Sequence, residues 1–207
     1  MLKFLVLVLT IALTGAKLGG DIADSVKTVD EFKCLKDHIS FVIFRAYRSL
    51  GSLDPTVVPN IKNSHAAGFT DIGAYIFPCF KCGNPKGQVL TTVNALKGLP
   101  YNELWIDVER HQWGTKEANR QFLAAMFEEA PKHGKPVGIY TSSAEWSVIV
   151  GNDWTAGAKF KLWWPRWDGK QTLDNFQPFA GWKSCYIKQY SDEVRKCNIE
   201  YDCNYKN

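Results

Sequence analysis

The sequence predicts an α/β protein whose strands close into a barrel, and three features lead to this fold class. Short apolar, β-prone runs alternate with helical segments from residue 19 to about residue 150, which is typical of a parallel sheet. The helices then stop, and three further strand candidates follow. The strand candidates number eight in all, and eight strands favour a closed barrel.

The strand candidates are short apolar runs, several of which end in an acid, an arginine or a tyrosine. Their apolar residues alternate little with polar ones, as expected for strands that are covered on both faces. We expect strands at residues 19–23, 40–47, 71–77, 103–109, 136–141, 161–164, 186–190 and 200–204.

The helix candidates fill the gaps between the first strands. Thr28 is a typical N-cap, and Glu31 completes a capping box with it. Two other helices end before Gly68 and Gly134, because glycine commonly terminates a helix. We expect helices at residues 28–35, 55–67, 88–96, 116–133 and 142–150.

The amino terminus has the pattern of a secretory signal peptide. A basic start at Lys3 is followed by an apolar run from Phe4 to Leu13 and by small residues up to Ala16. The run is too short to span a membrane. We therefore expect residues 1–16 to be a signal peptide and residues 17–207 to be a single catalytic barrel domain. The mature protein is expected to be secreted or to lie in the lumen of a lysosomal or phagosomal vacuole, with no membrane insertion after cleavage.

The charge is mildly basic, at +4, or +3 once Lys3 is removed with the signal peptide. The sequence has no long basic run of the kind that would indicate a nucleic-acid partner. The four histidines lack metal-ligand spacing, and no glycine-rich phosphate loop is present. We expect no cofactor, no metal and a monomeric protein.

Six cysteines follow the apolar amino terminus, and an even count in an exported chain favours disulfides. Cys79 and Cys82 form a CxxC motif, which also occurs in redox sites and as half of a zinc site. No second CxxC motif or histidine pair follows at zinc-ligand spacing. A structural disulfide is therefore the favoured interpretation.

The run from Leu104 to Glu109 is apolar except for two acids. A buried strand does not carry carboxylates without a reason, because desolvating them is very unfavourable. Strand geometry places Asp107 and Glu109 on one face, about 6.5–7 Å apart. Neighbouring acids in a dry site have pKa values that are pushed apart, which suits glycosidic bond cleavage. The alternative is a strand that ends at Val108, with both acids solvated in a loop.

Polar and aromatic residues recur at or near the carboxyl ends of the predicted strands, where barrel active sites lie. Arg45 is expected either to pair with Asp21 or Asp107 or to contact a substrate. The residues at these ends are Asp21, Arg45, Tyr75, Asp107, Glu109, Tyr140, Trp164, Gln189 and Asp202.

Taken in order, these segments resemble the lysozymes of glycoside hydrolase family 25, the N-acetylmuramidase type, and especially the secreted eukaryotic branch. The resemblance covers nearly the whole mature chain and implies a flattened, TIM-like barrel of five β/α units followed by three further strands. It rests on Gly20-Asp21-Ile22, Phe41-Val42-Ile43-Phe44-Arg45-Ala46-Tyr47, Gly73-Ala74-Tyr75-Ile76-Phe77, Leu104-Trp105-Ile106-Asp107-Val108-Glu109, Gly138-Ile139-Tyr140-Thr141-Ser142, Leu162-Trp163-Trp164, Lys188-Gln189-Tyr190 and Asp202-Cys203-Asn204.

The resemblance implies hydrolysis of the β-1,4 bond between N-acetylmuramic acid and N-acetylglucosamine in bacterial peptidoglycan. By its pattern, Glu109 is the proton donor, Asp107 its partner acid, and Asp21 and Asp202 further acids of the groove. Other residues fall near the bound sugar, namely Tyr75, Tyr140 and Gln189, with Trp164 and Arg45 as further candidate contacts. The chain departs from the family at residues 20–25, where a Val-Ser pair more often follows the aspartate, and at residues 163–167, where a small residue and a tyrosine are usual.

The resemblance also implies the disulfides Cys79–Cys82 and Cys34–Cys197, which leaves Cys185–Cys203 for the last pair. A retaining, an inverting and a substrate-assisted route all remain open, because side-chain rotamers decide the separation of the carboxyl groups. Three other functions are alternatives. A chitin-hydrolysing barrel is disfavoured because Trp105 stands where an Asp-x-Asp-x-Glu strand needs an acid. A binding module without catalysis and a thiol–disulfide oxidoreductase are the others.

Overall fold

The computed structural model describes residues 15–207. Most of the expected signal peptide, residues 1–14, therefore lies outside the described residues. Within the described part of the chain, no helix is long and apolar enough to cross a membrane.

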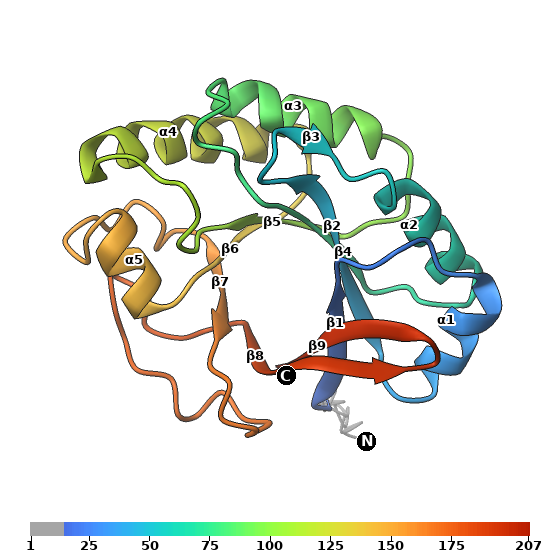
Figure 1. Ribbon diagram of the computed structural model, residues 1–207. Helices are drawn as coiled ribbons and strands as arrows, with labels where there is room; N and C mark the ends of the chain where they lie inside the picture. Colours follow the sequence, from blue (N-terminus) through green and yellow to red (C-terminus); the bar gives the residue numbers. More distant parts are fainter. Residues whose placement is uncertain (1–14) are drawn as a thin grey trace, which may run out of the picture.

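The strands form one sheet that closes on itself (Figure 1). Hydrogen-bonded neighbours follow the order β1-β9-β8-β7-β6-β5-β4-β2-β3, and an additional β1–β2 pairing completes the ring. All pairings from β1 through β2 and β4 to β8 are parallel, whereas β9 runs antiparallel to both of its neighbours. The strands are β1 (Lys17–Ile22), β2 (Phe41–Arg48), β3 (Ser52–Leu53), β4 (Ile72–Ile76), β5 (Glu103–Asp107), β6 (Val137–Tyr140), β7 (Lys161–Pro165), β8 (Ile187–Lys196) and β9 (Ile199–Lys206).

Helices pack around the outside of this ring (Figure 1). Each of the first five barrel strands is followed by a helix, and the last three are not. The predicted barrel of five β/α units and three further strands is therefore confirmed. The segment 166–186, between β7 and β8, contains no helix. The helices are α1 (Val29–Lys36), α2 (Val57–Ala66), α3 (Pro85–Ala95), α4 (Lys116–Glu129), the 3₁₀ helix η1 (Ala130–His133) and α5 (Ser143–Ile149).

Aromatic and branched side chains fill the interior of the barrel. Trp105 and Trp163 meet edge to face with ring centroids 5.7 Å apart, and both are almost fully buried. A Cβ atom at Gly138 would overlap the Trp105 ring, so glycine leaves the space that this ring occupies. The interior cluster is Phe41, Ile43, Tyr75, Trp105, Tyr140, Trp163 and Ile187. Because side chains fill the interior, the barrel that the described strands form has no open pore, and a site is expected at its mouth.

A larger apolar core lies between the barrel and the helices. Helix α1 contributes Phe32 and Leu35, which are fully buried. Its predicted capping box is confirmed, because the Thr28 side chain accepts from the Glu31 N–H while the Glu31 carboxylate accepts from the Thr28 N–H. The capping box thus fixes the start of the helix that follows β1.

Several elements differ from the predictions, and three of the differences have local reasons. The helix predicted to reach His133 is α-helical only to Glu129, because Pro131 has no N–H to donate. The two-residue strand β3 pairs with the end of β2 and is too short to predict from an apolar pattern. Strand β5 ends at Asp107, so Glu109 lies beyond the strand that was predicted to contain it.

Strands β8 and β9 form a hairpin, and β8 continues to Lys196, six residues beyond its predicted end. The outer half of β8 is mostly exposed and lacks the apolar run that indicates a strand. Cys197 and Asn198 form the turn, both with positive φ, at 53° and 59°, as a two-residue hairpin turn requires. The predicted disulfide between Cys34 and Cys197 is confirmed and ties this turn to α1.

The predicted disulfide between Cys185 and Cys203 is wrong, since both cysteines are unpaired. Cys203 on β9 lies opposite Ser191 of β8, and Cys185 precedes Ser191 by six residues. At about 3.3 Å per residue, this strand register separates the two cysteines by on the order of 15–20 Å. A disulfide needs Cα atoms within about 7 Å of each other.

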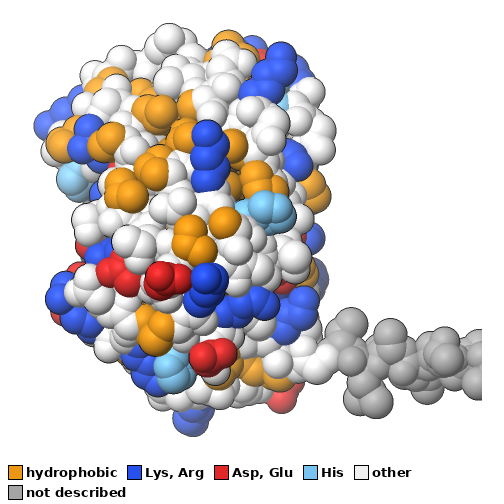
Figure 2. Space-filling model, turned by 90° about the vertical axis from the view of Figure 1, so that its right-hand side faces the viewer, with side chains coloured by type: hydrophobic (Ala, Val, Ile, Leu, Met, Phe, Trp, Pro, Cys, Tyr) orange, Lys and Arg blue, Asp and Glu red, His pale blue; other side chains and the backbone are white. Residues whose placement is uncertain are grey.

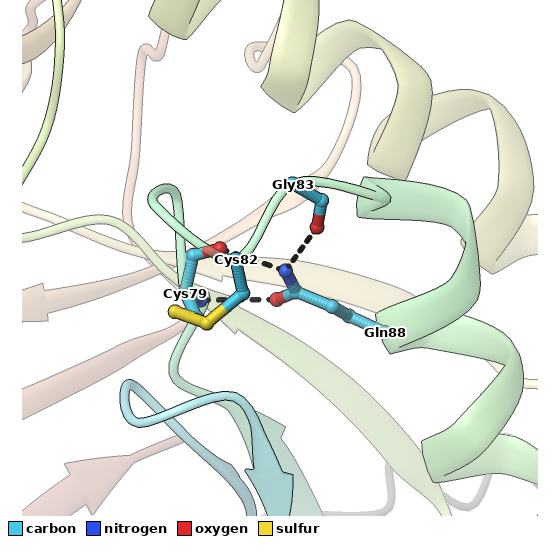
Figure 3. Close-up of a disulfide and its surroundings, with 4 residues drawn as sticks. All are labelled: Cys79, Cys82, Gly83 and Gln88. Atoms are coloured by element: carbon cyan, nitrogen blue, oxygen red, sulfur yellow. Dashed lines mark hydrogen bonds between the residues drawn. A yellow bond between two sulfur atoms is a disulfide. The ribbon is translucent and has the colours of Figure 1, made fainter.

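The predicted Cys79–Cys82 disulfide is confirmed and is held by a glutamine of α3 (Figure 3). The Gln88 side chain accepts from the Cys79 N–H at 3.0 Å and donates to the carbonyls of Cys79 and Gly83, both at 2.8 Å. Cys79 and Gln88 are buried. These contacts support a structural bond that fixes the loop after β4, in place of the redox and zinc alternatives.

The face of the molecule that carries α1 and α2 has no field of a single sign. Figure 2 shows Lys and Arg side chains intermixed with Asp and Glu side chains there. The small positive net charge is therefore not gathered into a basic patch on this face.

Candidate active site

A cavity of about 210 Å³ opens at the carboxyl ends of the parallel barrel strands. Each of β1, β4, β5, β6, β7, β8 and β9 contributes one side chain to its wall, and two loop residues complete it. The lining residues are Asp21, Tyr75, Asp107, Glu109, Tyr140, Trp163, Trp167, Gln189 and Asp202. The barrel thus brings together residues that lie as far apart in sequence as 21 and 202.

Gln189 is the centre of the hydrogen-bond network in this cavity. Its amide oxygen accepts from the Tyr140 hydroxyl and from Trp167 Nε1, both at 2.8 Å. Its amide nitrogen donates to Asp21 Oδ1 and to Asp202 Oδ2, both at 3.0 Å. All the hydrogen-bonding groups of this amide are therefore used to orient two acids and two aromatic side chains.

Asp21 is held from a second side by Asn204. The Asn204 amide donates to Asp21 Oδ1 at 2.6 Å, and its oxygen accepts from Trp163 Nε1 at 2.7 Å. Burial, followed by the nearby Asp202 carboxylate, raises the pKa of Asp21 to about 8. At neutral pH, Asp21 is consequently protonated in the free protein.

Asp107 lies deepest among the acids, with only 5% of its surface exposed. Its Oδ1 atom is buried and has no hydrogen-bond partner. Burial, then the neighbouring Glu109 and Asp21, raise the pKa of Asp107 well above its ordinary value. Because a buried polar atom without a partner is rare and unfavourable, this oxygen points to a group that a ligand would supply.

Glu109 follows β5 on a bend rather than in a strand. The Glu109 carbonyl accepts from Trp113 Nε1 at 2.6 Å, and the N–H of Val108 donates to the Tyr140 carbonyl at 2.8 Å. Burial, then the charges of Glu145 and Asp202, raise the pKa of Glu109. A raised pKa allows a carboxyl group to keep a proton at a pH where an ordinary glutamate has lost it.

Asp202 comes from the antiparallel strand β9, where it pairs across the sheet with Asp21. Burial raises the pKa of Asp202, although the N–H of Glu193 donates to its Oδ1 at 2.9 Å and opposes the shift. Four carboxyl groups therefore share one small cavity. Ionisation of one carboxyl group disfavours ionisation of its neighbours. The cavity can therefore hold protonated carboxyl groups beside ionised ones.

Tyr75, Tyr140 and Gln189 line the cavity, in the places where the sequence predicted sugar contacts. Trp164 does not. Successive side chains of a strand point to opposite faces, so Trp163 faces the barrel interior while Trp164 packs outward against Phe176.

Arg45 is likewise not among the lining residues of the cavity. Its Nε donates to Asp54 Oδ2 at 2.8 Å, and its Nη2 donates to the Ala23 carbonyl at 3.3 Å. The predicted pairing with Asp21 or Asp107 is therefore wrong, and Asp54, in the segment between β3 and α2, is the partner.

Four residues of the site region were not predicted from the sequence to be site residues. Trp163 and Asn204 carried a usable signal, because each lies on a strand face that the two-residue period fixes once a neighbour is assigned. Trp167 lies in the loop after β7, and Glu145 comes from α5. No strand pattern reaches those two positions.

Two further depressions are relevant to the site. One of about 220 Å³ shares Asp21, Tyr75 and Asp202 with it, which extends the site along β1 and β9. A larger depression, of about 880 Å³, lies between the α5 region and the segment 164–179, and Trp164 lines it. Its one acid, Asp168, accepts from the buried Lys188 at 2.6 Å and has a pKa lowered to about 2, so that depression lacks an acid–base pair.

Among residues 15–207, one group of three potential metal ligands comes close together, namely Cys34, His38 and Cys197. Its two cysteines are joined to each other. The acids of the cavity do not form such a group.

Comparisons with known proteins agree with this architecture. A family profile described as "Lysozyme-like protein 1" matches residues 13–190. The chain is 39% identical over 212 residues to "Probable GH family 25 lysozyme 4" of Dictyostelium discoideum, covering 99% of both chains. It is 41% identical over 199 residues to "Lysozyme-like protein 5" of Caenorhabditis elegans, covering 93% of this chain and 92% of the other. The bacterial lysozyme from Streptomyces coelicolor has the same fold, with a TM-score of 0.75, 19% identity and coverage of 94% and 93%.

Proposed function

The chain belongs to the glycoside hydrolase family 25 lysozymes, and on this premise we propose that its four-acid cavity cleaves bacterial peptidoglycan. The bond broken is the β-1,4 linkage between N-acetylmuramic acid and N-acetylglucosamine. One observation carries the assignment of the site: a lysozyme needs a protonated acid beside a second carboxyl group, and this cavity holds acids whose pKa values burial raises.

Glu109 is the proposed proton donor. Its carboxyl group is partly exposed to the cavity, whereas Asp107 lies deeper. Burial and the charges of Glu145 and Asp202 favour the protonated form of Glu109. In this role Glu109 gives its proton to the glycosidic oxygen as the bond to the sugar carbon breaks.

Asp107 is proposed to act on the sugar that develops positive charge. In the free protein its Oδ1 lacks a partner and its neutral form is favoured. A substrate N–H group or a developing positive charge beside this oxygen would favour the ionised form, because hydrogen bonds and opposite charges stabilise a carboxylate. In the free protein both Glu109 and Asp107 favour the protonated form. Substrate binding would ionise Asp107 and leave the proton on Glu109.

The remaining groups are proposed to position the substrate. Asp21 and Asp202 are fixed by Gln189 and line the cavity. Trp167 is 59% exposed and is anchored through its Nε1 to Gln189, so its ring is free to stack on a sugar face. The proposed partner is the insoluble cell-wall polymer, met by a monomer that is secreted or held in a vacuole where disulfides persist.

The test compares the wild type with Glu109→Gln on purified peptidoglycan and on chitin, by reducing-sugar release. Glu117→Gln on the exposed start of α4 is the matched control for loss of one carboxylate. We expect release from peptidoglycan alone, reduced at least about 100-fold in Glu109→Gln and unchanged in Glu117→Gln. Near-full activity of folded Glu109→Gln would refute the assignment.

The alternative functions give different results in the same assay. Equal release from chitin would place the substrate class among N-acetylglucosamine polymers in general. Absence of release from both polymers, with the wild type still sedimenting with peptidoglycan, would identify a binding module that retains the groove.

A further inference from the structure

Glu145 lies outside the cavity but binds the segment that carries Glu109. It stands in the first turn of α5, where its N–H donates to the Ser142 hydroxyl at 3.2 Å. Its carboxylate accepts from the Arg110 N–H at 2.7 Å, from Arg110 Nε at 2.9 and 3.0 Å, and from Arg110 Nη2 at 2.8 Å. Only 18% of the Glu145 side chain is exposed, against 62% for Arg110.

These bonds fix one particular peptide unit. The N–H of Arg110 and the carbonyl of Glu109 belong to the same peptide plane. Glu145 holds the N–H, and Trp113 Nε1 holds the carbonyl at 2.6 Å. Since β5 ends at Asp107, no sheet hydrogen bond restrains this peptide. Side chains from α5 and from the loop therefore determine where the backbone of Glu109 lies.

Glu145 also adds a charge next to the Glu109 carboxyl group. The titratable groups that face Glu109 come from several elements. They are Asp21 from β1, Tyr75 from β4, Asp107 from β5, Tyr140 from β6, Glu145 from α5 and Asp202 from β9. After burial, Glu145 is the largest cause that raises the pKa of Glu109. Arg110 is the cation that pairs with Glu145 and offsets that charge.

We propose that Glu145 is a positioning residue for the proton donor, which holds the Glu109–Arg110 peptide in place and keeps a negative charge beside the Glu109 carboxyl group. The inference rests on the proposed function, in which Glu109 is the acid. In this role Glu145 of α5 acts by contacting Arg110, the neighbour of Glu109, and does not contact the substrate.

An ordinary ion pair on the surface would stabilise the fold slightly and leave the pH dependence of catalysis unchanged. The two roles are separated by the pH profile of kcat/KM on peptidoglycan, whose alkaline limb reports loss of the proton from the donor. Three variants are informative: Glu145→Gln, Arg110→Met and Glu145→Ala. Asp153→Asn is the control, because Asp153 is an acid paired with an arginine, Arg120, and does not line the cavity.

The two single charge changes are expected to act in opposite directions. Glu145→Gln should move the alkaline limb to lower pH by about 0.5–1 unit, because it removes a negative charge and leaves Arg110 unpaired. Arg110→Met should move it to higher pH, because the Glu145 charge is then no longer offset. Glu145→Ala should also lower kcat about 10- to 100-fold, since a displaced catalytic group loses its alignment. Asp153→Asn should match the wild type.

The inference is overturned if Glu145→Gln and Arg110→Met leave the alkaline limb where Asp153→Asn leaves it. The conservative Glu145→Gln carries this test even where Glu145→Ala does not fold. Glu109→Gln, assayed in parallel, separates the two levels of the argument. An active Glu109→Gln refutes the proposed function, whereas an inactive Glu109→Gln with unshifted Glu145→Gln and Arg110→Met refutes only the role of Glu145.

Discussion

Replacing Asp21 with Asn should remove a large part of the pH dependence of folding. In the folded protein the pKa of Asp21 is about 8, against 3.8 for the unperturbed group, mainly because of burial. The folded pKa is the higher one, so between these values the folded state binds the extra proton. Stability linked to this group is therefore present at low pH and is lost as the pH rises toward 8.

The magnitude follows from the pKa shift. Between pH 5 and pH 8 an unfolded Asp21 is ionised while the folded group is still largely protonated. Each pH unit in that interval lowers the free energy of unfolding by about 1.36 kcal/mol. Over three units the wild type should lose up to roughly 4 kcal/mol that Asp21→Asn does not lose. Asn cannot ionise, but its oxygen can still accept from Asn204 and Gln189.

The assay is urea unfolding, followed by tryptophan fluorescence at intervals from pH 5 to pH 8, with both proteins in the same buffers. Groups remote from the cavity are the same in both proteins, so their contributions cancel in the difference. Asp24→Asn is a control of opposite character, because the pKa of Asp24 is lowered to about 2 and Asp24 is ionised throughout this interval in both states. The stability that Asp24→Asn loses relative to the wild type should be independent of pH. Parallel profiles for Asp21→Asn and wild type would refute the reasoning.

Three further changes test the fold. Gly138→Ala should destabilise the protein by about 1–3 kcal/mol in urea unfolding, since the new methyl group overlaps the Trp105 ring; an unchanged midpoint would contradict this packing. Thr28→Ala should cost about 1 kcal/mol through the lost helix cap, whereas Thr28→Ser should be close to wild type. Replacing both Cys34 and Cys197 with Ala should lower stability by about 2–5 kcal/mol, because their bond closes a loop with a sequence separation of 163. In thermal unfolding, reductant should destabilise the wild type more than the double variant, which keeps only the Cys79–Cys82 bond; an equal loss in both proteins would contradict this role.

The sequence predicted the site best where a residue sits at the carboxyl end of a barrel strand. Tyr75, Asp107, Tyr140 and Gln189 fall into the cavity because parallel strands bring their carboxyl ends to one mouth. It did not determine which face of a strand lines the cavity. Trp164 was predicted as a sugar contact, but Trp163 lines the cavity and Trp164 lines a separate depression, because a shift of one residue reverses the direction of a side chain.

Pairing between distant segments was the other source of error. Arg45 was expected to meet an acid of the barrel, but Asp54 in the segment after β3 reaches it first. The sequence contained all three candidate acids and could not rank them, because the ranking depends on how the chain turns between β2 and α2. The Cys185–Cys203 assignment failed for the same kind of reason, since the register of the β8–β9 hairpin keeps these residues apart.

By itself, the sequence determined the order of strands and helices, the barrel they form and the identity of the acids at its mouth. Those features depend on local periodicity, helix capping and the alternation of elements, all of which are properties of short segments. Only the tertiary structure decided that Gln189 orients Asp21 and Asp202, that Asp107 has an oxygen without a partner, and that Glu145 of α5 holds the peptide after Glu109. Burial and contact between remote segments set these properties, and both arise only when the barrel closes.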